Sequence, residues 1–294
     1  MPDDVSNGPA CPICGDFRHA DFRHKDSRRL LICRQCRHIF WESMPSGEVL
    51  RDYYSHAYTP SHNQLELQSS NRSYYNNHLG ELVRASGSAA PQLVLADYGC
   101  SFPVLLEEAG KMGFAGLIGI EEDTGATDYG RRSGITMVGM TEFAETVAPG
   151  SIDIIRFSHV LEHLLDPVGT LGKAAEKLRP GGLLYITQPS FPVFVADEPY
   201  PLELADCVWP EHLHYFSPCS LWTMVKRAGF KVRRLFTHQN CEQVFGRVAP
   251  HLDLAYSAET LLPLASLGDA HFGRWANYPV FTGENSVLYA GLDA

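Results

Sequence analysis

From residue 92 onward, short apolar runs alternate with amphipathic segments. This alternation is typical of a parallel sheet whose strands are joined by crossover helices. Seven runs have the apolar character of strands, and they lie within 93–99, 114–122, 134–139, 151–160, 181–189, 230–236 and 285–293. The sequence therefore predicts an α/β fold built on a seven-stranded sheet.

Two crossover helices have clear start and stop signals. Asp166 and Pro167 supply an N-cap and a first-turn proline, and "RPGG" at 179–182 ends that helix. Ser217 and Pro218 open the second helix, which ends at Gly229. The residues expected to face inward are Val168, Leu171, Ala175 and Leu178 in the first helix, and Leu221, Met224, Val225 and Ala228 in the second.

Two C-x2-C pairs stand near the N-terminus. Cys11 and Cys14 form the first pair, and Cys33 and Cys36 form the second. Each pair can present two thiolates to one tetrahedral ion, and the spacer lets two hairpin turns face each other. The pattern predicts a zinc ribbon over residues 1–42, with a structural zinc ion held by all four cysteines.

The charge of the chain is uneven. Residues 16–38 are rich in arginine, whereas the whole chain carries a net charge of -10. A general polyanion binder needs clustered Lys and Arg, so the acidic balance argues against nucleic acid as the main partner. The basic ribbon could contact RNA or an acidic partner, but we favour a solvated surface on a structural module.

The sequence shows no export signal and no apolar run long enough to span a bilayer. We therefore expect a cytoplasmic protein without a membrane partner, whose cysteines are thiols or metal ligands. The cysteines outside the two pairs are expected to be buried or pocket thiols, namely Cys100, Cys207, Cys219 and Cys241.

Residues 43–91 read as a helical linker and N-terminal cover. We expect a connecting helix within 41–58 and a second helix within 65–85, and "SGSAAP" at 86–91 then marks a break. The main domain is expected to occupy 92–294.

Ligands of open α/β sheets bind beyond the carboxyl ends of the strands. The first predicted strand leads to Asp97 and Gly99, and the second ends at Glu121. A carboxylate at that position can accept both hydroxyls of a ribose. The spacing by itself suits NAD, FAD or S-adenosylmethionine.

Four motifs make the resemblance more specific. They are "DYGCSFPVLLEEAG", "GLIGIEEDTGATDYGRRSGITM", "IIRFSHVLEHLLDPVGTLGKAAEKLRPGGLLYITQP" and "EHLHYFSPCSLWTMVKRAGFKV". In order and spacing they resemble the class I S-adenosylmethionine-dependent methyltransferases, whose sheet is Rossmann-like. With the ribbon and the segment after it, the chain looks closest to a bacterial small-molecule branch that includes sugar C-methyltransferases. The resemblance covers residues 11–236 and leaves 240–284 uncovered.

The resemblance implies a set of cofactor-binding residues. Asp97, Gly99 and the turn through Ser101 would face the methionine end of S-adenosylmethionine, and Glu121 would take the ribose hydroxyls. The adenine would rest near Met140 and Thr141, where the acidic residue often found at the Met140 position is missing. The methyl group would lie beside Ser158 and His159.

The glycine turn departs from the usual repeat, since Ser101 and Pro103 stand where glycines are common. Gly99 remains for close backbone approach and an unusual φ. We expect Ser101 to cap the next helix and Pro103 to lie in its first turn. Because S-adenosylmethionine has no pyrophosphate, we interpret the loop as altered and competent.

A long segment, 190–216, follows the fifth predicted strand and is rich in proline and aromatic residues. Such a loop in a compact domain is usually functional, so we predict a substrate pocket for a small-molecule acceptor. It ends in "EHLHYF", which brings Glu211, His212 and His214 to the carboxyl edge of the sheet. His is the usual general base near neutral pH, and a neighbouring carboxylate can orient it.

In the resembling sugar C-methyltransferases, a Glu-His pair in this loop and a His after the fourth strand are associated with deprotonating the acceptor. Those roles map onto Glu211, His212 and His163. The branch has a tyrosine where this chain has Trp209, which argues against C-methylation of a keto-sugar. The same histidines could instead brace loops or, as pairs, suggest a second metal, which we do not favour.

Three functions remain open from the sequence. The first is methyl transfer from S-adenosylmethionine to a small molecule, such as a sugar or a natural-product intermediate. The second is a zinc-ribbon RNA methyltransferase, and the third is a catalytically inactive binding module. Residues 240–284 are expected to be an insertion that covers the core, or else a lid or dimer surface.

Overall fold

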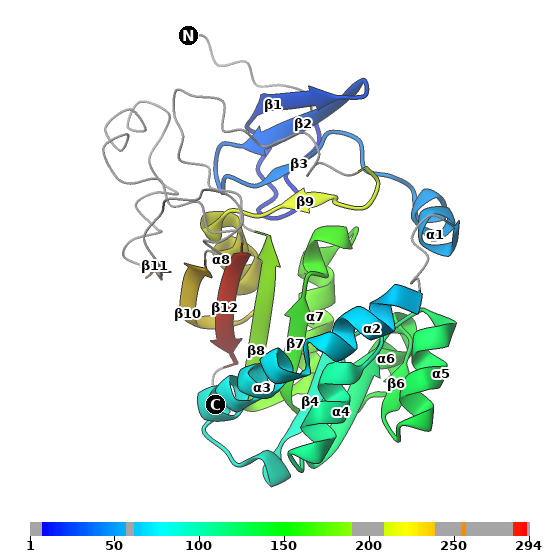
Figure 1. Cartoon of the computed structure of the whole chain (residues 1–294). Helices are drawn as coiled ribbons and strands as arrows, with labels where there is room; N and C mark the ends of the chain where they lie inside the picture. Colours follow the sequence, from blue (N-terminus) through cyan, green and yellow to red (C-terminus); the bar gives the residue numbers. More distant parts are fainter. Residues whose placement is uncertain (1–7, 57–61, 190–208, 239–253, 257–284, 293–294) are drawn as a thin grey trace, which may run out of the picture.

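The computed structural model describes residues 8–56, 62–189, 209–238, 254–256 and 285–292. Most of the predicted pocket segment 190–216 and most of the insertion 240–284 lie outside these described residues, as do Cys207 and Cys241. Within the described ranges, a small cysteine-bearing module lies above a large α/β domain (Figure 1).

The large sheet has the strand order β11-β10-β12-β8-β7-β4-β5-β6. Its strands are β4 (Val94–Tyr98), β5 (Gly116–Ile120), β6 (Thr136–Val138), β7 (Ile152–Ser158), β8 (Leu178–Pro189), β10 (Lys231–His238), β11 (Leu254–Tyr256) and β12 (Asn285–Gly291). The strands from β4 to β8 pair in parallel, and β12 runs antiparallel to both β8 and β10. All seven predicted strands are therefore present. The eighth, β11, comes from the segment predicted as an insertion and pairs with the edge of β10.

Helices cover both faces of this sheet, which explains why its strands read as continuous apolar runs. One face packs α3 (Arg72–Ser86) and α4 (Val104–Lys111) against strand residues such as Leu95 and Ile154. The other face packs α7 (Pro167–Lys177) and α8 (Pro218–Arg227) against Ile155 and neighbouring residues. Two shorter helices, α5 (Thr124–Arg132) and α6 (Met140–Thr146), follow β5 and β6.

The punctuated helices start as predicted. The Asp166 side chain accepts the Gly169 N–H at the start of α7, and the Ser217 side chain accepts the Ser220 N–H at the start of α8. Leu178 does not belong to the helix, because it pairs with Ile152 as the first residue of β8. Leu178 is buried nonetheless, as a residue of the strand and not of the helix.

The N-terminal cover contains one helix more than predicted. α1 (Gly47–His56) is the expected connecting helix, but the second predicted helix is divided into α2 (His62–Ser70) and α3, with Asn71 between them. α3 provides the buried Leu79 and Leu82, whereas the residues of α2 are half-buried or exposed where the structure describes them. The buried residues of this cover therefore come from α3 and, through Leu50, from α1.

The cysteine module has its own sheet, with strand order β1-β2-β3-β9. Its first three strands are β1 (His19–Lys25), β2 (Arg28–Cys33) and β3 (Ile39–Trp41). The fourth, β9 (His214–Tyr215), comes from the end of the predicted pocket segment and pairs antiparallel with β3. The sheet of the module thus includes residues from both sides of the predicted boundary at residue 42.

No helix in the described part of the chain combines the length and the apolarity that crossing a membrane requires.

Candidate functional site

The turn after β4 depends on Gly99. Its φ is +65°, and a Cβ at this position would lie 2.6 Å from Cγ2 of Val160. Both the left-handed backbone and the close side chain therefore require glycine. The Gly99 N–H donates to the Ile120 carbonyl at 2.8 Å, which ties the turn to the end of β5.

Ser101 does not cap α4, contrary to the prediction. Its φ is +49°, and Pro103 occupies the N-cap position without a side-chain hydrogen bond to the helix. The Ser101 N–H instead donates to Oε2 of Glu121 at 2.8 Å. The left-handed backbone turns this amide toward the next strand and away from the helix.

Glu121 stands at the end of β5, where the sequence predicted the ribose ligand. Its Oε1 accepts the N–H groups of Glu122 and Asp123 at 2.8 and 3.0 Å, so backbone amides fix both carboxylate oxygens. Glu122 was not singled out by the sequence reasoning. Its Oε1 accepts the Met140 N–H at 2.6 Å, which ties the start of α6 to the end of β5. The sequence does show that Glu122 is adjacent to Glu121, and this adjacency could have pointed to it.

Asp97 lies below this turn in a buried polar cluster. Nη1 of Arg156, on the neighbouring strand β7, is 2.7 Å from Oδ1 of Asp97. Nε of the same guanidinium is 3.4 Å from Nε2 of His78 on α3. Burial raises the pKa of Asp97, and the Arg156 charge opposes that shift. The sequence missed Arg156 because an arginine in the middle of an apolar strand gives no sign of its partner.

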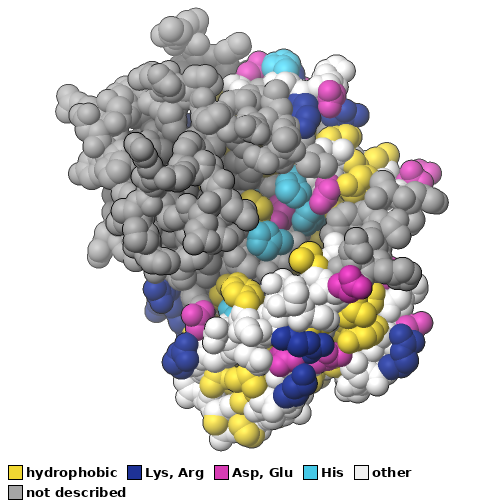
Figure 2. Space-filling model, viewed as in Figure 1, with side chains coloured by type: hydrophobic (Ala, Val, Ile, Leu, Met, Phe, Trp, Pro, Cys, Tyr) yellow, Lys and Arg dark blue, Asp and Glu magenta, His cyan; other side chains and the backbone are white. Residues whose placement is uncertain are grey.

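Ser158 and His159 stand at the carboxyl end of β7. His159 has a φ of +53°, and its N–H donates to the Thr187 carbonyl at 2.9 Å. The short helix η2 (Leu161–His163) follows and brings Glu162 and His163 to the same edge. Histidine and acidic side chains gather near the middle of the face shown in Figure 2, below the cysteine module.

The three predicted acid–base residues come together at this edge. A ligand-type atom of each of His163, Glu211 and His212 lies within 4.8 Å of the others. The rings of His163 and His212 meet edge to face, with centroids 4.9 Å apart. The Tyr53 hydroxyl, from α1, donates to Oε2 of Glu211 at 2.7 Å. Tyr53 was not among the predicted site residues.

His163 is neutral near pH 7, because burial and the neighbouring His212 lower its pKa to about 4. Its Nδ1 lies 2.9 Å from the Glu211 carbonyl oxygen, which can only accept, so Nδ1 carries the proton. The lone pair of the ring is therefore at Nε2. This nitrogen lies 3.8 Å from Oε1 of Glu162.

Glu162 is buried, and neither of its carboxyl oxygens has a hydrogen-bond partner among the described residues. Burial raises the pKa of this carboxyl to about 8. Glu162 is therefore mainly protonated at neutral pH, and it stands between His159 and His163. The sequence motif "LEH" drew attention to His163, but it does not show that the preceding carboxyl is buried.

His214 is not part of this cluster. Its Nδ1 lies 3.0 Å from Nε2 of His38 in the cysteine module, and its Nε2 lies 2.8 Å from the Leu164 carbonyl. Both ring nitrogens are thus engaged, and the side chain is 1% exposed. His214 therefore does not act together with His212, because its ring is held between His38 and the Leu164 carbonyl.

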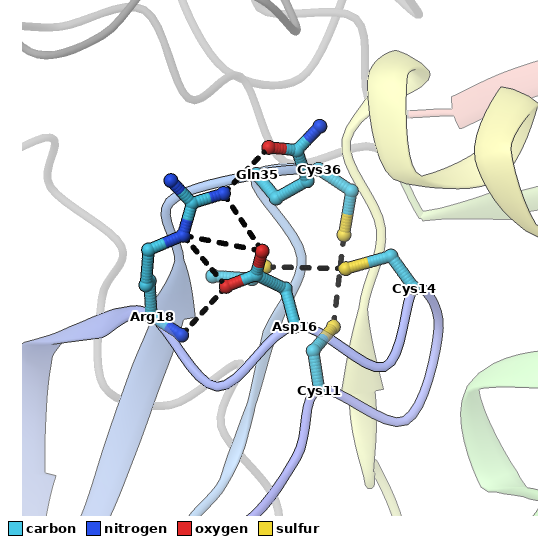
Figure 3. Close-up of polar contacts among 7 residues, drawn as sticks. Cys11, Cys14, Asp16, Arg18, Gln35 and Cys36 are labelled. Atoms are coloured by element: carbon cyan, nitrogen blue, oxygen red, sulfur yellow. Dashed lines mark hydrogen bonds and ion pairs between the residues drawn. The ribbon is translucent and has the colours of Figure 1, made fainter. Parts of the chain in front are cut away.

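The thiols of the cysteine module converge on one point (Figure 3). Sγ of Cys11 lies 3.6 Å from Sγ of Cys36, and Sγ of Cys14 lies 3.5 Å from Sγ of Cys33. A disulfide would be about 2.05 Å long, whereas thiolates around a tetrahedral zinc ion with bonds of about 2.3 Å lie roughly 3.8 Å apart. The donor set and its spacing therefore fit a tetrahedral ion. Elsewhere, Cys100 and Cys219 are buried thiols as predicted.

Comparison with known proteins identifies the family. The methyltransferase domain family matches residues 70–235, which is more than half of the 294 residues. The chain belongs to this family.

Two curated relatives of this methyltransferase are named ubiquinone biosynthesis O-methyltransferase. The one from Nitrosococcus oceani is 26% identical over 168 residues, which cover 53% of this chain and 70% of the relative. The one from Cupriavidus pinatubonensis is 24% identical over 181 residues, which cover 57% and 72%.

Solved structures show the same fold. A SAM-dependent methyltransferase from Archaeoglobus fulgidus aligns with a TM-score of 0.51 at 16% identity, covering 75% of this chain and 94% of the other. A chain from the complex of the Haloferax volcanii Trm112 methyltransferase activator with a methyltransferase aligns with a TM-score of 0.51 at 12% identity, covering 86% and 100%.

The protein is thus an S-adenosylmethionine-dependent methyltransferase. The residues at the sheet edge fit this cofactor by their chemistry, since a fixed carboxylate stands at the end of β5 and a tight glycine turn precedes α4. These groups suit a ribose and a closely approaching ligand, respectively.

Proposed function

We propose that this methyltransferase methylates an oxygen atom of a small-molecule acceptor, with His163 and His212 as the candidate bases and Glu211 as their carboxylate partner. The observation that carries the proposal is the convergence of His163, Glu211 and His212, in which His163 is neutral and has its lone pair at Nε2. This cluster stands at the carboxyl edge of the sheet, where ligands of such folds bind. A neutral imidazole there can accept the proton of an acceptor hydroxyl.

The cofactor, when bound, supplies an electrophilic methyl group on a sulfonium. The acceptor oxygen would take this methyl group, and the cofactor would leave as the thioether product. The hydroxyl proton passes to Nε2 of His163 or to His212. Glu211, itself fixed by Tyr53, would hold the developing imidazolium in place through its negative charge.

We propose that the residues predicted from the sequence bind S-adenosylmethionine. Gly99 and Ser101 form the turn, Glu121 would accept hydrogen bonds from the ribose hydroxyls, and Met140 and Thr141 would border the adenine. Ser158 and His159 would border the methyl group. Asp97 would act from below the turn, where Arg156 holds its carboxylate.

Oxygen is favoured over carbon as the acceptor atom by two observations. The curated relatives reported above are named O-methyltransferases. The chain also has Trp209 where the resembling sugar C-methyltransferases have tyrosine. We therefore propose a hydroxyl group on a small-molecule acceptor related to those of ubiquinone biosynthesis, ahead of a sugar or another natural-product intermediate.

We also propose that the four converging cysteines hold a structural zinc ion. A zinc ion would remove the repulsion among closely spaced thiolates and would link the segments that carry the two C-x2-C pairs. The metal content of the purified chain, compared with that of a Cys33→Ser variant, tests this point. A full-length chain without bound zinc after purification in zinc-containing buffer would contradict it.

The RNA methyltransferase alternative is weakened by how the arginines of the module are used. Arg18 pairs with Asp16, and Arg29 pairs with both Asp21 and Glu42. These acidic partners reduce the positive charge available to a phosphate backbone. Salt-sensitive RNA binding by the purified protein would revive this alternative.

Calorimetric titration with S-adenosylmethionine and with its demethylated product tests the cofactor site. We expect micromolar binding of both in the wild type, loss of at least tenfold in Glu121→Ala, and a smaller loss in the adjacent control Glu122→Ala. The absence of binding in the wild type would favour the inactive binding module.

Transfer of a labelled methyl group to 3,4-dihydroxybenzoate, compared with a keto-sugar, tests the acceptor class. His163→Gln and His212→Gln are expected to lower turnover by about 10²- to 10⁴-fold at an unchanged cofactor affinity, as for loss of a general base. Unchanged turnover in both variants would remove these residues as bases.

A further inference from the structure

We propose that the cysteine module positions the candidate bases, with His38 and Trp41 as the positioning residues. The inference rests on the proposed function, because that function makes His163 and His212 the candidate bases. The contacts that support it do not depend on which acceptor is used. Neither residue stands among the predicted site residues, and each contacts the backbone or side chains that flank the Glu211–His212 pair or His163.

The first contact is a shared strand. Ile39 pairs with Tyr215 and Phe40 pairs with His214, so β9 completes the sheet of the module. Only Leu213 separates Glu211 and His212 from the start of this strand. The backbone that carries the two candidate acid–base residues is therefore anchored to the module through β9. The chain then continues into α8 of the large domain.

The second contact fixes His212 itself. Nε1 of Trp41 donates to the His212 carbonyl at 2.8 Å, and the indole is 1% exposed. The same indole meets Trp209 edge to face at 5.3 Å, while Arg28 of the module lies over Trp209 at 4.7 Å. Trp41 thus contacts residues on the two sides of Glu211.

The third contact is a directed chain of histidines. The Leu164 carbonyl can only accept, so Nε2 of His214 carries a proton. His214 is neutral because burial lowers its pKa to about 4, and its Nδ1 therefore accepts. Nε2 of His38 must then be the donor at 3.0 Å. The chain runs from His38 through His214 to Leu164, the residue that follows His163.

The three contacts converge on the geometry of the two bases. Trp41 acts on His212, and His38 acts through His214 on the turn that holds His163. The Leu213 N–H donates to the Glu162 carbonyl at 2.8 Å, which joins the two segments directly. The edge-to-face contact of His163 with His212 therefore depends on how the module holds both segments.

Nuclear magnetic resonance of the full chain measures this geometry without an acceptor. Ring signals of His163 and His212 are assigned with His→Gln variants, and the Overhauser effect between the rings reports their contact. We expect Trp41→Phe and His38→Leu to shift both signals and to abolish this effect. Arg29→Gln, which removes ion pairs elsewhere in the module, is the matched control and should leave the ring signals unchanged.

His38→Gln provides the conservative rescue. Its amide N–H can replace the Nε2 donor, so the ring contact and the signals should return toward those of the wild type. In the methyl-transfer assay, His38→Leu and Trp41→Phe should lower kcat at least tenfold while the Kd for S-adenosylmethionine stays within twofold.

Retention of the ring contact and of kcat in folded Trp41→Phe and His38→Leu would overturn the inference. A Kd that rises as much as kcat falls would also overturn it, because the module would then act on the whole fold. If the wild type neither binds S-adenosylmethionine nor transfers methyl groups, the proposed function fails. The ring contact would still decide whether the module positions the two histidines.

Discussion

At the scale of single residues, Gly99 combines backbone strain with close packing. We expect Gly99→Ala to lower the free energy of unfolding by roughly 2–4 kcal/mol, since a left-handed alanine costs about 1 kcal/mol and overpacking adds about 1–3. Gly113→Ala is the matched control, because its φ is +82° but nothing lies within 4 Å of its Cβ position. Urea unfolding measures both variants, and equal losses would show that contact with Val160 contributes nothing.

Glu162 gives a pH-dependent prediction at the same scale. Its pKa is raised from 4.5 to about 8, so the folded chain binds a proton that the unfolded chain has released. The stability due to this group is present below about pH 4.5 and is lost as the pH rises through 8. Between pH 6 and 9 the wild type should lose roughly 2–3 kcal/mol relative to Glu162→Gln. Parallel stability curves for the two proteins would contradict a raised pKa.

At the scale of the elements, the Asp97–Arg156 pair joins two central strands. Removing one partner of a buried pair leaves an uncompensated charge and costs about 3–5 kcal/mol. We expect Arg156→Met to show this loss in urea unfolding and Asp97→Asn/Arg156→Met to recover much of it. Arg179→Met is the control, since its half-exposed pair with Asp153 should contribute no more than about 1 kcal/mol. If the double variant is as unstable as Arg156→Met, the unpaired charge of Asp97 is not the cause of the lost stability.

The same scale shows what the sequence predicts well. The seven strands follow from apolar runs with buried faces, and α7 and α8 follow from Asp166 and Ser217, because these signals are local. Ser101 was misassigned because its conformation depends on Glu121, which lies on another strand. β9 and β11 are too short to give a periodic signal, and their pairing partners are far away in the sequence.

The candidate site divides in the same way. His163, Glu211 and His212 could be named from motifs and do come together. Tyr53, Trp41 and Arg156 could not be named, because each matters through a contact with a remote segment. His214 does not join the three residues that come together, because its ring contacts His38 and the Leu164 carbonyl, two partners that are remote in the sequence.

At the scale of the whole molecule, buried histidines make the fold sensitive to acid. Burial lowers the pKa of His78 to about 3 and those of His163 and His214 to about 4. These depressed values mean that the unfolded chain binds more protons below pH 6.5, so stability falls from there down to about pH 4. Each such histidine should contribute a loss of roughly 1–2 kcal/mol between pH 7 and 5.

Urea midpoints at pH 7 and pH 5 measure this loss. His78→Gln, which removes one titrating ring, should show a shallower decline than the wild type. His24→Gln is the control, because His24 is exposed. If both variants decline as steeply as the wild type, His78 does not contribute to the acid sensitivity.

The strand shared between β3 and β9 also has a consequence for how the chain is made. His38 and His214 are 176 residues apart, so the N-terminal module leaves the ribosome long before its last strand exists. At about 5–20 residues per second, that interval lasts roughly 9–35 s. During this time β3 presents an unpaired edge next to buried apolar residues, a surface that other nascent chains can join. The module is therefore open to association with other chains at this edge until the residues of β9 have been synthesised.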